Sequence, residues 1–338
     1  MMNESRQSNF EILRIVAMLF IIIHHHLQNI TMTCGYSSLY NYDRDGFTGI
    51  LINSFVVGGV NLFVMISGYF GIRHVCNKLL KIFIDVFVYS SLSYMASNLF
   101  TSSTLDLHSF FTSIDFRYYW FVTNYAILVL FSPILEAALK NQRKEKISYW
   151  IILLLIINVI FGFIFEESSL LTGYNFSNFF LLYLMARYIR LAKEDNNKIY
   201  KHFSTYGWLY WIISAILLAL GLLVLSMMNK VPDSKHYFGY NNPLILFYCF
   251  CLFACFSKYK LNSKLINTIS TGMFGVYLIH TSASFCPIWI KFSSSIYNNI
   301  GYIGIFISSL IILVILSPLT IVIEKMTSKL KSCIVYKL

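Results

Sequence analysis

The stretch FEILRIVAMLFIIIHHHLQNI, from Phe10 to Ile30, is long and apolar enough to cross a hydrocarbon core of about 30 Å as a helix. It nevertheless carries Arg14 and His25, and ionisable residues are costly in hydrocarbon and are rarely kept there without a use. Helical residues turn by about 100° each, so these two side chains share one face, roughly 16 Å apart along the axis. The stretch therefore predicts a membrane helix that carries a cation and an imidazole on one line.

The rest of the chain repeats this apolar pattern. Of its 338 residues, 57% are hydrophobic and only 12% are charged, and the hydrophobic residues come in long uninterrupted runs. Such runs predict an all-α integral membrane protein, a bundle of about ten transmembrane helices, because a membrane β-barrel would alternate instead. The expected spans are Phe10 to Ile30, Leu51 to Ile72, Leu79 to Phe100, Tyr118 to Leu139, Ile147 to Phe165, Phe176 to Ala192, Gly207 to Met228, Pro243 to Phe256, Gly272 to Phe292 and Ile300 to Ile323.

The distribution of basic residues predicts an orientation. An even number of spans places both termini on one side, and 21 of the 26 lysines and arginines lie on that side, at the termini, in the gaps or in the adjoining ends of the spans. Because basic residues are retained on the cytoplasmic side, we expect both termini there, in a multi-pass protein of the cytoplasmic membrane. The net charge of +11 then reflects this bias and contact with anionic lipid headgroups, and it requires no nucleic-acid partner.

The chain shows no internal repeat, linker or appended soluble domain, so residues 1–338 are expected to form a single membrane domain. Three of its seven cysteines, Cys249, Cys251 and Cys255, lie within one apolar span, and no pair has the spacing of a metal site. We therefore expect no metal site and no tightly bound cofactor.

Four short motifs occur in order along the chain: Glu11-x-x-Arg14 followed after ten residues by His25, Phe63 to Tyr69 (FVMISGY), Tyr119-Trp120-Phe121 with Pro133, and Gly275 to His280 (GVYLIH). With ten spans, this set resembles the membrane-bound acyltransferase family 3. The resemblance implies a ten-helix enzyme that moves an acyl group, usually acetyl, from cytoplasmic acyl-coenzyme A to sugars across the membrane. Typical acceptors are lipopolysaccharide, capsule, exopolysaccharide and peptidoglycan.

The resemblance also implies roles for the first motif. Arg14, about 6 Å into the span, would anchor or orient the donor through the coenzyme A phosphates. His25, about 22 Å in, would act as catalytic base or carry the acyl group itself, and the sequence leaves both routes open. Glu11, at a position where aspartate is usual, is counted with these catalytic residues.

Other residues are candidates for supporting roles. Arg73, Lys78 and Lys81 would assist donor binding in place of a compact basic motif, although positive-inside placement explains them equally well. Asp85 is the intramembrane acid expected either to face His25 or to pair with those basic residues.

For each remaining candidate, two alternative roles are expected: contact with the substrate or support of the structure. Trp120 would stack on a sugar or belong to an interfacial aromatic belt. Ser67, beside Gly68, and Tyr277 would contact substrate or support the helix packing. His280 would be a second catalytic group or an interhelical hydrogen-bonding residue, and the same structural role is expected for His24 or His26, which point away from the Arg14 face.

Two other classes of protein compete with an acyltransferase. A secondary transporter or flippase of an envelope precursor would show paired repeats and interrupted helices, and a polysaccharide polymerase or ligase would carry a larger outer loop. As an acyltransferase, the protein is expected to use acyl-coenzyme A as co-substrate and an envelope glycan or lipid-linked saccharide as acceptor. Its other expected partners are membrane lipids.

Overall fold

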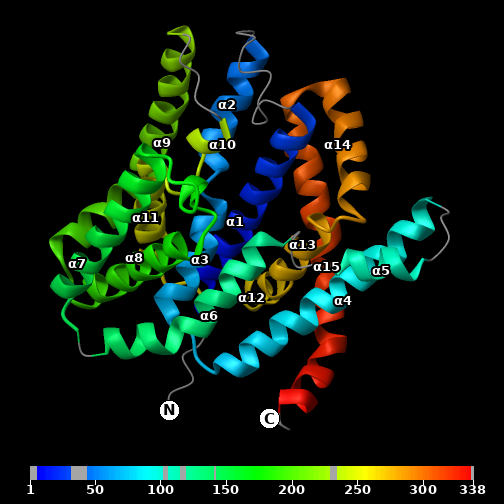
Figure 1. Cartoon of the computed structure of the whole chain (residues 1–338), viewed down its shortest axis with the longest axis horizontal. Helices are drawn as coiled ribbons and strands as arrows, with labels where there is room; N and C mark the ends of the chain where they lie inside the picture. The colour runs from blue at the N-terminus through cyan, green and yellow to red at the C-terminus, as the bar shows by residue number, and fades with distance from the viewer. Residues whose placement is uncertain are drawn as a thin grey trace.

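The first helix of the expected bundle lies at its centre. The computed structural model describes residues 6–31, 44–101, 106–114, 119–140, 142–228 and 234–335. In it, α1 (Ser8–His26) packs against α2 (Arg44–Val56), α3 (Gly59–Phe70), α11 (Pro243–Lys258), α12 (Lys264–Thr271), α13 (Met273–His280) and α15 (Tyr302–Val335) (Figure 1). This central position explains why α1 has many fully buried apolar side chains, among them Phe10, Leu13 and Ile22.

The remaining helices surround this core. They are η1 (Leu27–Thr31), α4 (Val75–Thr101), α5 (Leu107–Ser113), α6 (Trp120–Leu139), α7 (Lys144–Leu155), η4 (Ile156–Ile164), η5 (Leu171–Gly173), α8 (Phe176–Glu194), α9 (Lys198–Met227), α10 (Ser234–Tyr237) and α14 (Cys286–Ile300). Large apolar side chains are exposed along α4, α7, α9 and α15, as expected of helix faces that contact lipid.

Seven helices in the described ranges are long and apolar enough to cross a membrane, fewer than the ten spans expected. They are Ser8–Ile30, Gly46–Phe70, Val75–Phe100, Trp120–Leu139, Lys144–Ile164, Lys198–Leu225 and Tyr302–Ser328. Of the other three expected spans, α8 carries a charged C-terminal end and α11 has only 16 residues. The third expected span, Gly272 to Phe292, is interrupted between two shorter helices.

The expected span from Gly272 to Phe292 is two helices, which corrects the prediction of one continuous helix. α13 ends at His280, and α14 begins at Cys286 after a short turn. Pro287 lies in the first turn of α14, where its missing N–H is tolerated, whereas in a continuous helix its ring would clash with the carbonyl of Ala283. The break places the C-terminal end of α13, and with it His280, inside the bundle.

The two ends of the described chain lie at the same end of the bundle. In Figure 1, α1 runs upwards from its start, so its start points to the same lower side of the picture as the C-terminal part of α15. Ser8 binds the loop before α12 through its backbone N–H, which donates to the Leu261 carbonyl at 3.0 Å, and through Ser263 N–H, which donates to Ser8 Oγ at 2.7 Å. We refer to this end as the terminal end and to the opposite one as the far end.

Candidate active site

One face of α1 carries four residues in the order Arg14, Met18, Ile21 and His25. Their spacing of four, three and four residues is that of a helical stripe, as the sequence predicts for its two ionisable members. Met18 and Ile21 line a small cavity of about 10 Å³, whose other lining residues are Val60, Phe63, Phe121, Phe274 and Tyr277. The cavity is constricted and has room for little more than one water molecule.

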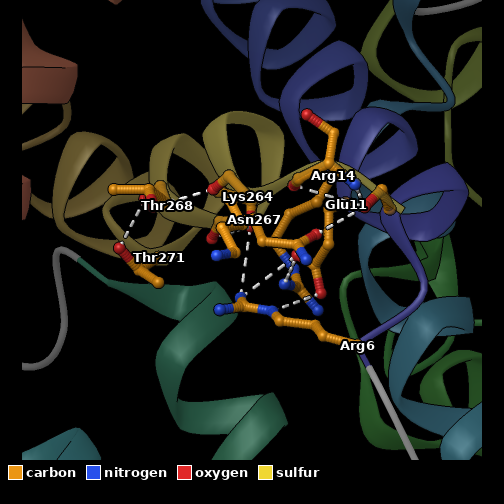
Figure 2. A network of polar contacts seen from close by, with 10 residues as sticks. Arg6, Glu11, Arg14, Lys264, Asn267, Thr268 and Thr271 are labelled. Carbon is orange, nitrogen blue, oxygen red and sulfur yellow. Dashed lines mark hydrogen bonds and ion pairs between the residues drawn. The ribbon is translucent and has the colours of Figure 1, made fainter. Parts of the chain in front are cut away.

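A charged cluster surrounds Arg14 at the terminal end of this stripe. Glu11 forms ion pairs with Arg14 and with Arg6, whose Nε donates to Oε1 of Glu11 at 2.8 Å (Figure 2). Arg6 also donates to Ser270 Oγ of α12 at 3.2 Å. One carboxylate therefore orients two guanidinium groups, and the three side chains together keep one positive charge.

Tyr125 of α6 joins the candidates on three other helices. Its hydroxyl lies 2.8 Å from Ser67 Oγ of α3, and Nζ of Lys78 on α4 lies 5.2 Å from the centre of its ring. The Tyr125 side chain also interacts electrostatically with Arg14. Tyr125 was not among the candidates from the sequence. It nevertheless lies next to three residues that were, namely Ser67, Lys78 and Arg14.

The other predicted donor residues are not part of this cluster. Arg73 follows α3, Lys81 lies on α4, and both side chains are exposed. Two further arginines, Arg187 and Arg190 of α8, lie at the end of α3: Arg187 pairs with Glu136, and Nη1 of Arg190 donates to the Tyr69 carbonyl at 3.3 Å. From the sequence alone, these two arginines are only two of the many basic residues that fit the positive-inside pattern.

The imidazole of His25 meets that of His280 further along the stripe. Nδ1 of His25 lies 3.0 Å from Nε2 of His280, and the ring centres are 5.1 Å apart. Nδ1 of His280 lies 2.9 Å from the carbonyl oxygen of Val276, one turn earlier on α13. His280 is buried, whereas His25 is partly exposed. His280 therefore makes the interhelical hydrogen bond expected of it, and its partner is His25, the predicted catalytic histidine.

The neighbouring histidines point away from this pair, as their helical angles predict. His24 Nδ1 lies 2.6 Å from Asn53 Oδ1 of α2, and His26 Nδ1 lies 2.9 Å from Ser309 Oγ of α15. Both imidazoles are buried, and each joins α1 to a different helix. Their contacts support a structural role.

Asp85 of α4 interacts with Tyr89 of the same helix, and its expected contact with His25 stays a prediction. Asp85 lies one turn before Tyr89, and the interaction between the two side chains is electrostatic. The Tyr89 hydroxyl donates to Glu324 of α15 at 3.1 Å. The packing of α4 against α13 and α15 positions Tyr89, because Gly275 has no side chain and lets the Tyr89 ring approach α13.

Two aromatic candidates make ring contacts within the protein. Tyr277 packs against Phe121 with ring centres 5.3 Å apart and reaches His280 at 5.9 Å. Trp120, at the start of α6, stacks on Tyr174 at 4.4 Å with nearly parallel rings. Trp120 is therefore part of an aromatic cluster within the protein, and Tyr277 connects the cavity to the histidine pair.

Tyr125 and Arg6 had weak signals in the sequence. Tyr125 follows Phe121 by four residues, which places both on one face of α6, and their rings stack at 5.6 Å. Arg6 precedes Glu11 by five residues, and only the fold of the chain before α1 shows that the two meet.

Comparison with known proteins agrees with this arrangement. The family model of acyltransferase family 3, described as an acyltransferase domain, matches residues 7–323. The match includes all four sequence motifs and the stripe on α1. No curated protein and no solved structure matched the chain. On the family match, which covers nearly the whole chain, this membrane protein belongs to acyltransferase family 3 and is an acyltransferase.

Proposed function

We propose that this protein transfers an acyl group, in the simplest case acetyl, from acyl-coenzyme A to a hydroxyl of a cell-envelope saccharide. The observation that carries the proposal is the stripe on α1, where Arg14 and His25 lie on either side of the Met18 and Ile21 cavity. This arrangement supports the proposal, because the guanidinium group proposed to bind the donor and the imidazole proposed to react with it share one face of α1.

The terminal end has the chemistry to bind the donor. Arg14, Arg6 and Glu11 keep a net positive charge, and Lys78 adds a second one next to Tyr125. Guanidinium groups bind phosphate oxygens through charge-assisted hydrogen bonds, and coenzyme A carries several phosphates. The positive-inside distribution favours a cytoplasmic location for this end, where acyl-coenzyme A is available.

The pantetheine arm would extend from Arg14 towards His25. The distance between these residues along the helix, roughly 16 Å, is similar to the length of that arm when extended. The cavity is too narrow for it in this structure, so donor binding requires displacement of at least one of Phe63, Phe121 and Phe274. Side chains that move to admit the arm would also exclude water from the thioester once it is bound.

His25 would catalyse the transfer at the other end of the path. As base, it takes the proton of the acceptor hydroxyl while that oxygen attacks the thioester carbonyl, the C–S bond breaks, and the imidazolium returns the proton to the thiolate. As acyl carrier, His25 attacks the carbonyl with a ring nitrogen, the C–S bond breaks and the thiolate leaves; the acceptor hydroxyl then attacks the acyl group on the imidazole, and the proton of that hydroxyl goes to the thiolate. Both routes give an ester and free coenzyme A.

The acceptor would approach from the far end. His25 lies in the last turn of α1 and is partly exposed, so a hydroxyl on a saccharide at the membrane surface can reach it without crossing the bundle. A glycan or a lipid-linked saccharide fits this approach, because both present hydroxyls at the surface.

The first test measures transfer by purified protein in lipid nanodiscs supplied with acetyl-coenzyme A and a crude envelope saccharide fraction. We expect release of free coenzyme A thiol and new base-labile acetyl esters on the saccharide, detected by proton resonance. Thiol release without ester formation would contradict the proposed acceptor. Absence of both would contradict the proposed donor and reaction.

One feature favours transport as a second function. The break between α13 and α14 produces a discontinuous helix inside the bundle, as found in many secondary transporters. Vesicles that contain the protein distinguish the two functions, because a transporter would move a saccharide precursor across the membrane without an acyl donor. We expect no such movement.

A further inference from the structure

The hydrogen bonds of His280 determine which of its ring nitrogens carries a proton. Nδ1 lies 2.9 Å from the Val276 carbonyl oxygen, and a carbonyl can only accept, so Nδ1 must carry hydrogen. A neutral imidazole has one N–H, which leaves Nε2 of His280 as an acceptor. The polar contacts that the described residues make with this ring, which include the Val276 carbonyl and His25, do not require a second proton.

The neutral form of His280 follows from its surroundings. The side chain is only 5% exposed, and none of the contacts that the described residues make with it involves a carboxylate. Burying a cation without a counterion costs much free energy, so the uncharged imidazole is favoured.

This assignment extends to His25. Its Nδ1 lies 3.0 Å from the acceptor nitrogen of His280, so the hydrogen of that bond belongs to His25 Nδ1. In neutral His25, Nε2 then has a free lone pair. Among the described residues no hydrogen bond involves Nε2, and the side chain is partly exposed.

We propose that His280 is a positioning residue that holds His25 in the Nδ1–H tautomer and presents its Nε2 lone pair to the reacting groups. The inference rests on the proposed role of His25. During transfer Nε2 takes the proton of the acceptor hydroxyl and later returns it to the thiolate, while the Nδ1–H bond to His280 persists and stabilises the imidazolium. His280 gains and loses no proton.

The fold supports this role. His280 is the last residue of α13, where the helix breaks before Pro287, so its side chain turns back to the Val276 carbonyl of the last turn. The same break brings the end of α13 to α1 instead of carrying the helix past it. A group that accepts a hydrogen bond from the non-reacting ring nitrogen commonly fixes the tautomer and orientation of a functional imidazole.

The test uses two substitutions of similar size. His280→Gln supplies an amide oxygen that can accept from His25 Nδ1, whereas His280→Met fills the space but offers no comparable acceptor. Both proteins are purified in nanodiscs, and thiol release from acetyl-coenzyme A is measured in the presence of the envelope saccharide fraction. We expect kcat to fall by 10-fold to 100-fold for His280→Met and by less than 10-fold for His280→Gln, with the KM for acetyl-coenzyme A unchanged in both.

His26→Gln is the matched control, because His26 is a buried histidine of the same region whose hydrogen bond to Ser309 leads away from His25. Its kcat should stay close to that of the wild type. Equal losses for His280→Gln and His280→Met, or loss of kcat with a parallel loss of thermal stability, would show that His280 only fills space and would overturn the inference. A wild-type protein that releases no thiol would instead contradict the proposed function.

Discussion

The carboxylate of Glu11 binds the guanidinium group of Arg14 one turn further along α1 and at the same time that of Arg6 before the helix. Glu11 is 5% exposed, so it is the buried member of the cluster, while both arginines are partly exposed. Glu11 therefore holds Arg14 in place without a ligand, which would reduce the entropy lost on binding the phosphates of the proposed donor.

The first prediction concerns this orientation. Glu11→Ala removes the shared counterion and should destabilise the protein by roughly 1–3 kcal/mol, a range kept low because the arginines remain partly solvated. It should also raise the KM for acyl-coenzyme A, because Arg14 loses its fixed position. Thermal unfolding in detergent and donor titration of thiol release measure the two effects. The control is Glu145→Ala, which removes an exposed acid from α7. If both variants behave alike, Glu11 does not orient Arg14.

The second prediction separates two lysines that the sequence could not distinguish. Lys78 lies over the Tyr125 ring next to the Arg14 cluster, whereas Lys81 is exposed on α4. Lys78→Gln should raise the KM for acyl-coenzyme A about 10-fold, the effect of losing one charge-assisted hydrogen bond, and Lys81→Gln should change it less than 3-fold. Donor titrations of both purified variants provide the comparison. Equal changes would mean that only the overall positive charge matters.

The sequence predicted the α1 stripe because the positions of Arg14 and His25 on a helix follow from a fixed angle per residue. It also predicted that His24 and His26 would point elsewhere. These are properties of one helix, and no other helix is needed to derive them. The contacts in the structure agree with both predictions.

Properties that depend on two helices were predicted less well. The partner of Asp85 could not be derived from one helix, because it depends on how α4 packs against α13 and α15, where the Tyr89 ring lies beside Gly275. The break after His280 had a visible signal in Pro287, but apolar composition alone suggested a continuous span. Hydropathy reports the environment of a segment and not whether its backbone is continuous.

The third prediction compares the three consecutive histidines. His25→Gln should lower kcat for transfer by about 10²-fold to 10⁴-fold while acyl-coenzyme A still binds, because the base or acyl carrier is lost. His24→Gln and His26→Gln should lower thermal stability, since each removes a buried contact, but should leave kcat within about 3-fold. Turnover, donor binding by calorimetry and thermal unfolding together distinguish these outcomes. A His25→Gln protein with normal turnover would remove His25 from the site.

The fourth prediction tests the path between Arg14 and His25. Met18 lines the constricted cavity on the shared face, and its side chain is 1% exposed. Met18→Trp adds a larger ring that would occupy the cavity, so the pantetheine arm could no longer reach His25, although its phosphates could still bind at Arg14. We therefore expect loss of at least 10-fold in kcat with nearly unchanged affinity for coenzyme A.

Met18→Leu is the control for this change, because the two side chains have similar volume and such exchanges usually cost less than 1.5 kcal/mol. Overpacking by tryptophan can cost about 1–3 kcal/mol, so thermal unfolding is measured for both variants to show that Met18→Trp is folded at the assay temperature. A folded Met18→Trp protein with wild-type turnover would mean that the acyl group reaches His25 by a route that does not pass this cavity. Loss of coenzyme A binding as well would instead place part of the donor's phosphate site inside the cavity, closer to Met18 than to Arg14.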